Sequence, residues 1–161
     1  MAFLAIDPGD TLGFAEFAGD GKFEGMGQVN TKRVSMQKWL RIKIEARRDA
    51  SDDPFTLIIC EDYKISSYSQ KKFMAHKGSR VPTIKQIGSI ESVAEFYGIP
   101  VHLQPNVNYP IGAKWGGFDI PSNHSISHQY VATAHGIFYL QQNGLRKPSL
   151  ISVMKENRDG D

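Results

Sequence analysis

The alternation of apolar and polar positions predicts a chain that begins with strands and continues with alternating helices and strands. Short apolar or alternating runs at 3–6, 13–17 and 22–30 are typical of strands, and Asp20-Gly21 provides a tight turn between the last two. Because these runs follow one another closely, we expect an antiparallel three-stranded meander at the start of the chain.

Helical spacing replaces the strand pattern after the meander. Met36, Leu40 and Ile44 recur at the spacing of one helical face, and Lys and Arg residues fill the other face. Ser35 precedes this pattern and is predicted to cap the helix, which we expect to end near Ala50.

The second half of the chain alternates between strands and helices. The continuous apolar run 55–60 fits a strand covered on both faces, as parallel sheets require. The pattern then predicts a helix at 83–97, a strand at 99–103, a long Pro- and Gly-rich loop at 104–123, and a helix at 125–140. The resulting order, β-β-β-α-β-α-β-α, implies an α/β fold with a mixed five-stranded sheet and helices on both faces.

Composition narrows the class of protein without identifying a function. The chain has 161 residues, 40% hydrophobic and 22% charged, which fits one globular domain at 1–161 with a peripheral tail at 146–161. The single cysteine, Cys60, excludes an intramolecular disulfide and favours a reducing compartment. The apolar N-terminus meets Asp7 too early for a signal peptide or a membrane span, so we expect a cytoplasmic protein without membrane contact.

Two acidic residues stand where apolar strands end. Asp7 follows the first strand and Glu61 follows the run at 55–60. If these strands are neighbours, the two carboxylates repel each other, and a divalent cation such as Mg²⁺ removes that conflict. Each acid alone is equally consistent with a turn or with the end of a strand. The pair together favours a metal site.

Four segments, in order along the chain, match the pattern of one known family. Residues 7–15 read Asp-Pro-Gly-Asp-Thr-Leu-Gly-Phe-Ala, and residues 58–63 read Ile-Ile-Cys-Glu-Asp-Tyr. Residues 86–90 with 97–101 have the pattern of a helix that leads into a fifth strand, and 128–140 that of a last helix. These segments resemble the RuvC family of Holliday-junction resolvases, in particular its small phage-encoded members.

The resemblance covers roughly residues 2–142 and implies an RNase H-like fold. The implied activity is a metal-dependent endodeoxyribonuclease that resolves Holliday junctions or other branched DNA by phosphodiester hydrolysis. Members act as homodimers, so the implied partners are four-way junction DNA and a second copy of the chain, with no small-molecule cofactor. The implied cofactor is Mg²⁺ or Mn²⁺, as two ions, and a phage-encoded protein would act in the host cytoplasm. The implied catalytic and metal-binding residues are Asp7, Glu61 and His128, with Asp62 and His124 as further candidate ligands.

The last helix departs from the family pattern at one position. The family carries an acid three residues after the position of His128, and this chain has Val131 there, which cannot bind a metal. Imidazole suits Mn²⁺ better than Mg²⁺. Two alternatives therefore stay open: a catalytically silent module that binds nucleic acid or protein, and a nuclease for structured RNA. His135 lies in an apolar stretch of the same helix and is interpreted as a structural residue.

Basic residues gather between the second strand-end acid and the following helix. No Asp or Glu occurs between Tyr63 and Ile90, and aromatic residues are interleaved with the Lys and Arg residues. This pattern predicts a DNA-binding segment, with a solvated loop as the alternative. Next to Lys114, the ring of Trp115 is predicted either to stack on a base or to fill a gap in the packing. The predicted nucleic-acid-binding residues are Lys64, Tyr68, Lys71, Lys72, Lys77, Arg80, Lys85, Lys114 and Trp115.

Overall fold

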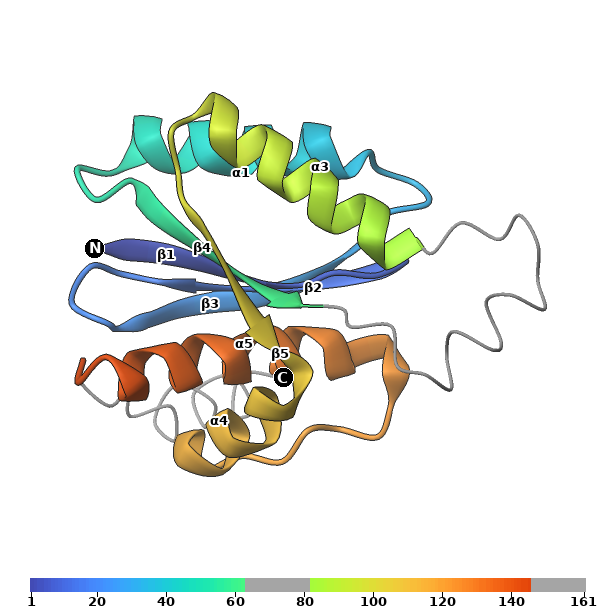
Figure 1. Cartoon of the computed structure of the whole chain (residues 1–161), viewed down its shortest axis with the longest axis vertical. Helices are drawn as coiled ribbons and strands as arrows, with labels where there is room; N and C mark the ends of the chain where they lie inside the picture. The colour runs from blue at the N-terminus through green and yellow to red at the C-terminus, as the bar shows by residue number, and fades with distance from the viewer. Residues whose placement is uncertain (63–81, 146–161) are drawn as a thin grey trace, which may run out of the picture.

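A computed structural model describes residues 1–62 and 82–145. The described strands form one five-stranded sheet, which lies between two layers of helices (Figure 1). The strands lie in the order β3-β2-β1-β4-β5. β1, β2 and β3 form an antiparallel meander, and β4 and β5 add to β1 in parallel. The predicted meander and mixed sheet are confirmed. The strands are β1 (Ala2–Asp7), β2 (Thr11–Phe17), β3 (Phe23–Asn30), β4 (Phe55–Asp62) and β5 (Val101–Pro105).

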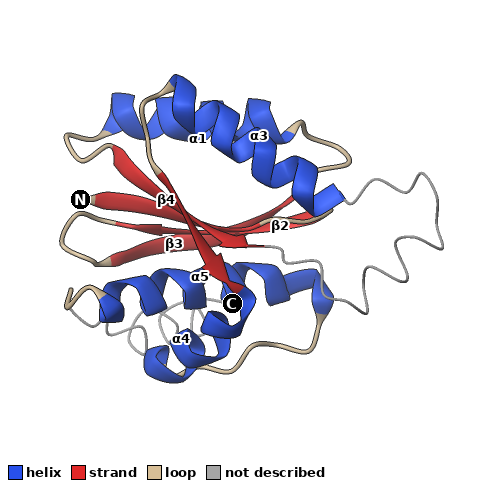
Figure 2. Ribbon diagram, viewed as in Figure 1, coloured by secondary structure: helices blue, strands red, loops and turns tan. Residues whose placement is uncertain are grey.

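Helices cover both faces of the sheet, as predicted (Figure 2). α1 (Met36–Ala50) and α3 (Pro82–Phe96) lie together on one face, and α5 (His124–Gln142) crosses the other. Ser35 caps α1, because its hydroxyl accepts a hydrogen bond from the backbone N–H of Lys38 at 3.5 Å.

The region 104–123, predicted as a long loop, contains helical structure instead. A short 3₁₀ helix, η1 (Asn106–Asn108), leads into α4 (Tyr109–Gly116), which packs against the outside of α5. The prediction was wrong because Pro110 stands in the first turn of α4, where its missing N–H costs no hydrogen bond. Gly112 does not break the helix, because it is a contact position: a Cβ there would lie 1.9 Å from the carbonyl oxygen of Ala134 in α5.

The alternation of side chains along β1 divides the core into two halves. Leu4 and Ile6 face α1 and α3, whereas Phe3 and Ala5 face α5. All four are at most 1% exposed, so β1 is covered on both faces. The central strand is therefore a rigid support for the residue at its end, Asp7.

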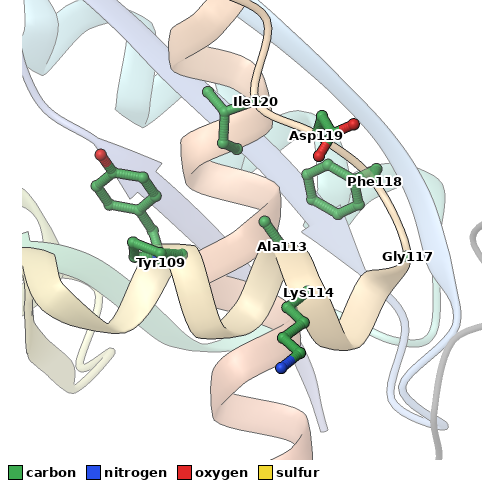
Figure 3. A pocket seen from close by; sticks show the side chains of 8 residues that line it. Tyr109, Ala113, Lys114, Gly117, Phe118, Asp119 and Ile120 are labelled. Atoms are coloured by element: carbon green, nitrogen blue, oxygen red, sulfur yellow. The ribbon is translucent and has the colours of Figure 1, made fainter.

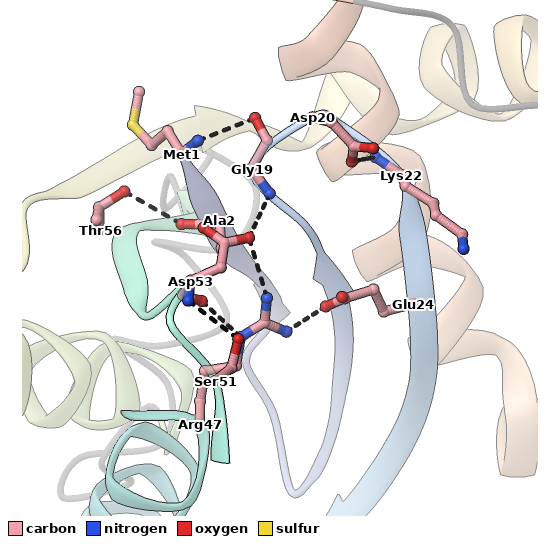
Figure 4. A network of polar contacts seen from close by, with 10 residues as sticks. All are labelled: Met1, Ala2, Gly19, Asp20, Lys22, Glu24, Arg47, Ser51, Asp53 and Thr56. Atoms are coloured by element: carbon pink, nitrogen blue, oxygen red, sulfur yellow. Dashed lines mark hydrogen bonds and ion pairs between the residues drawn. The ribbon is translucent and has the colours of Figure 1, made fainter. Parts of the chain in front are cut away.

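Polar contacts hold together the edge of the sheet at which β1 begins (Figure 4). Arg47, in the last turn of α1, donates from Nε to the carbonyl oxygen of Asp53 at 2.8 Å and also pairs with Glu24 of β3. The Asp53 carboxylate accepts a hydrogen bond from the backbone N–H of Gly19 at 2.7 Å. These bonds connect α1, the residues just before β4 and the β2–β3 turn. They lie at the end of the sheet opposite Asp7.

Helix α5 lies unusually close to the sheet at one point, Gly13 of β2. A Cβ at Gly13 would lie 2.0 Å from the carbonyl oxygen of His128, so no side chain fits there. Gly13 pairs with Asp7 across the β1–β2 ladder, so the same close approach brings His128 toward the end of β1.

We expect Gly13→Ala to destabilise the protein by about 1–3 kcal/mol, the usual cost of forcing an extra carbon into a packed core. The matched control is Gly25→Ala in β3, where a Cβ meets nothing within 4 Å. Urea denaturation followed by circular dichroism measures the free energy of unfolding of both variants. Equal stabilities for the two variants would contradict the close packing of α5 on β2.

Candidate metal-dependent site at the end of β1 and β4

The register of the sheet places a row of residues from four strands on the face that α5 covers. Gly13 of β2 pairs with Asp7 of β1, and Glu61 of β4 pairs with Gln104 of β5. β1 and β4 are adjacent parallel strands. Ile6, which precedes Asp7, pairs with Cys60, which precedes Glu61. The strands that end in Asp7 and Glu61 are therefore neighbours, which is the condition on which the expected metal site depends, and the two side chains share one face.

Asp7 is bonded to the histidine that the family pattern selected. Its Oδ2 lies 2.6 Å from Nδ1 of His128, on the second turn of α5. The Asp7 side chain is 10% exposed and the His128 side chain is 31% exposed. The structure therefore brings together two of the three predicted site residues directly, with His128 on the solvent side of the pair.

Glu61 is bonded to a different histidine, His135. His135 Nε2 lies 3.2 Å from Glu61 Oε2, and His135 Nδ1 lies 2.9 Å from Oε1 of Gln104. The interpretation of His135 as structural is incomplete, because this buried residue also contacts a predicted catalytic acid. Its partners stand 74 and 31 residues away in the chain, so no local sequence signal could have identified the contact.

Burial and a neighbouring charge act together on Asp7. Burial raises the pKa of Asp7 above its usual value, and the charge of Glu61 raises it further, although the hydrogen bond from His128 acts in the opposite direction. The same hydrogen bond to Asp7 raises the pKa of His128, while partial burial of the ring opposes this. The site thus contains a buried carboxyl, Asp7, whose ionisation is disfavoured by the neighbouring charge of Glu61, and a bound cation would relieve this.

The donor set fits a hard divalent cation that keeps part of its water shell. Mg²⁺ is commonly held by one or two carboxylates, with water and substrate phosphate oxygens as its other ligands. Asp7 and Glu61 provide the two carboxylates. Among residues 1–62 and 82–145 no group of three or more His, Cys, Asp or Glu side chains could enclose a metal ion by itself. The two carboxylates therefore fit a hard divalent cation whose other ligands are not protein side chains of this kind.

The other predicted ligands lie in different positions. Asp62 follows Glu61 in β4, so its side chain leaves the sheet on the opposite face. His124 is the first residue of α5, one turn before His128. Val131, at the position of the missing acid, is half-buried one turn after His128. The assignment of Asp7, Glu61 and His128 as metal ligands stays a prediction.

Three of the predicted DNA-binding residues lie in the described part of the chain. Lys85 is exposed near the start of α3, and Lys114 and Trp115 are exposed on α4. Trp115 lies in a helix, not in the expected loop, and its ring stacks on Phe138 of α5 with 5.4 Å between centroids. The other predicted residues lie outside the described residues: Lys64, Tyr68, Lys71, Lys72, Lys77 and Arg80.

A hollow of about 540 Å³ opens beside α4 (Figure 3). Tyr109, Ala113 and Lys114 line it from the helix, and Phe118 and Asp119 line it from the segment that follows. The ring of Tyr109 also packs edge-on against buried His135, with 6.1 Å between centroids. One wall of the hollow is therefore in contact with the residue that bonds Glu61.

Comparison with solved structures identifies the fold. The structure described as Thermus thermophilus RuvC in complex with Holliday junction substrate matches at a TM-score of 0.61 and 16% sequence identity, over 92% of this chain and 99% of that chain. A second Thermus thermophilus RuvC structure matches at a TM-score of 0.57, with the same identity and coverage. No protein-family profile matches the sequence. No curated protein matches it either.

The chain therefore has the RNase H-like fold of RuvC, which confirms the predicted fold class. At 16% identity the likeness shows the architecture and leaves the chemistry to be argued from the site. No helix in the described part of the chain is long and apolar enough to cross a membrane.

We expect the stability of the metal-free protein to fall as the pH rises above about 6.5, the ordinary pKa of histidine. The folded state raises the pKa of His128, so its contribution is complete below that pH and is lost as the pH passes the raised folded value. The pair is partly exposed, so the loss is on the order of 1 kcal/mol.

Urea denaturation at several pH values in EDTA measures this loss. His128→Gln should flatten the profile between pH 6 and 8.5. A wild-type profile that is no steeper than that of His128→Gln would contradict the assigned pairing of His128 with Asp7.

Proposed function

We propose that this protein is a metal-dependent endonuclease that hydrolyses phosphodiester bonds in branched DNA, with four-way junctions as its substrate. One observation carries the proposal: Asp7 and Glu61 lie on one face at the ends of adjacent parallel strands, and His128 lies against Asp7. The likeness to a RuvC structure described with Holliday junction substrate supports the choice of DNA over RNA.

Asp7 and Glu61 are the residues that would hold the divalent cation, Mg²⁺ or Mn²⁺. A bound ion of this kind supplies a Lewis acid and lowers the pKa of water, and two such ions can act on the attacking and the leaving oxygen. The buried strands β1 and β4 fix both carboxylates before substrate binds. Little reorganisation is then required during the reaction.

His128 moves a proton in this proposal. Its Nδ1 is hydrogen-bonded to Oδ2 of Asp7, and it is the more exposed member of that pair. Its ring is therefore the group placed to exchange a proton with a phosphate oxygen or with solvent.

Three helix N-termini add partial positive charge at the end of the sheet near Asp7. α1, α3 and α5 all begin at this edge, and none has an acidic residue in its first turn (Figure 1). Thr31, shortly before α1, donates to the carbonyl oxygen of Gly9 at 3.0 Å, and Gln86 of α3 donates to the Thr31 hydroxyl at 2.9 Å. Helix N-termini carry partial positive charge, so they favour the approach of a phosphate backbone.

Two symmetry-related strands of a junction must be cut to resolve it. We propose that a homodimer supplies the two sites and that the protein acts in the cytoplasm. Lys85, Lys114 and Trp115 are proposed to contact the arms of the junction, the lysines through phosphates and Trp115 by stacking.

We expect Asp7→Asn and Glu61→Gln each to reduce cleavage of a labelled four-way junction by roughly 100-fold or more, because each removes a cation ligand. Binding of the junction in EDTA should be retained. Asp49→Asn is the matched control, because that carboxylate is 76% exposed on α1 and should leave cleavage unchanged. Equal cleavage by wild type and Asp7→Asn would show that the catalytic assignment is wrong.

The effect of Val131 separates an active nuclease from a silent binding module. Val131→Asp places a third carboxylate one turn from His128 and should increase Mg²⁺-dependent cleavage by about tenfold. Val131→Asn is the control of similar size without charge. If the wild type binds junctions without cleaving them and Val131→Asp gains activity, the wild type is a silent module that has lost one ligand.

A further inference from the structure

His135 occupies a position that packing alone would give to an apolar residue. Its side chain is fully buried near the middle of α5, and its neighbours Ala134 and Ile137 are buried as well. A buried imidazole is costly unless its polar atoms are bonded. Both ring nitrogens have a partner, Glu61 on one side and Gln104 on the other.

Gln104 supports this arrangement from the neighbouring strand. It is 2% exposed and pairs with Glu61 in the β4–β5 ladder, so both side chains leave the sheet on the side of α5. The Gln104 amide lies 2.9 Å from His135 Nδ1, which fixes the plane of the imidazole ring. Gln104, His135 and Glu61 thus form a continuous chain of polar contacts that ends at a proposed cation ligand.

The contact with His135 involves only one oxygen of Glu61. Oε2 lies 3.2 Å from His135 Nε2, and the Glu61 side chain keeps 18% of its surface exposed. A carboxylate held by one oxygen has its rotamer fixed and can still ligate a cation with the other. Tyr109 packs edge-on against the imidazole.

We propose that His135 is a positioning residue which, together with Gln104, fixes the rotamer of Glu61 so that its second oxygen is presented to a divalent cation. This inference rests on the proposed function and adds two residues, neither of which is a ligand itself. His135 acts only through Glu61, and that restriction makes the inference testable.

The test measures Mn²⁺ affinity of the full chain by calorimetry, without DNA. His135→Leu should weaken Mn²⁺ binding roughly 10- to 100-fold, the usual cost of losing a residue that orients a metal ligand. The double variant His135→Leu/Gln104→Leu removes both polar groups and should bind equally weakly without leaving Gln104 unpaired in the core. If His135→Leu does not fold, the Mn²⁺ affinity of the double variant still tests the inference.

Thr133→Val is the matched control. Thr133 is a fully buried polar residue of the same helix whose hydroxyl donates to the carbonyl oxygen of Gln129 at 2.8 Å, away from Glu61. This variant should bind Mn²⁺ within about twofold of wild type if loss of a buried polar group on α5 is not enough to disturb the site.

A double-mutant cycle separates positioning from a general structural role. In the background of Glu61→Gln, His135→Leu should not weaken Mn²⁺ binding further, because its effect passes through Glu61. An unchanged affinity for His135→Leu, or the same loss in both backgrounds, would overturn the inference. Junction cleavage should show a lower kcat with an unchanged KM.

The proposed function can fail independently. A wild type that binds Mn²⁺ but cleaves no branched DNA overturns the nuclease proposal, and the Mn²⁺ cycle still decides the role of His135. A wild type that binds no Mn²⁺ overturns both.

Discussion

The contact that the site depends on is the close packing of α5 against β2, where at Gly13 no side chain separates helix from strand. Gly13 allows the carbonyl group of His128 to approach the sheet, and Gly136 of α5 in turn makes room for the ring of Phe17, 2.2 Å from where a Cβ would lie. Two glycines, one on each element, therefore set the depth of α5. His128 and His135 reach the carboxylates because the helix lies that deep.

The carboxylates stand where the apolar core on this face gives way to polar groups. Phe3 and Ala5 precede Asp7 on the same face of β1, as Leu57 and Ile59 precede Glu61 on β4. Each acid is thus the last position of a buried stripe. Apolar residues exclude water from one side of each acid, and the end of the strand leaves the other side accessible. This position explains why burial and the charge of Glu61 both raise the pKa of Asp7.

The sequence is sufficient to predict most of the fold and half of the site. The apolar runs of β1 and β4 are long enough to indicate buried strands, but the sheet order β3-β2-β1-β4-β5 is what makes these strands neighbours and brings Asp7 beside Glu61. The pattern misses α4 because Gly112 and Gly116 are typical of loops, although here they pack against α5 and Phe118. The role of His135 depends on strand register and helix depth, which no local pattern encodes.

The spacing of the two histidines has a consequence for changes in chain length. His128 and His135 are seven positions apart, about two helical turns, so both face the sheet. Deletion of one residue between them would rotate one histidine by about 100° relative to the other and detach it from its carboxylate. The segment at 117–123 precedes α5, so a change in its length does not rotate one histidine relative to the other. Natural or engineered insertions should therefore accumulate there and not within the helix.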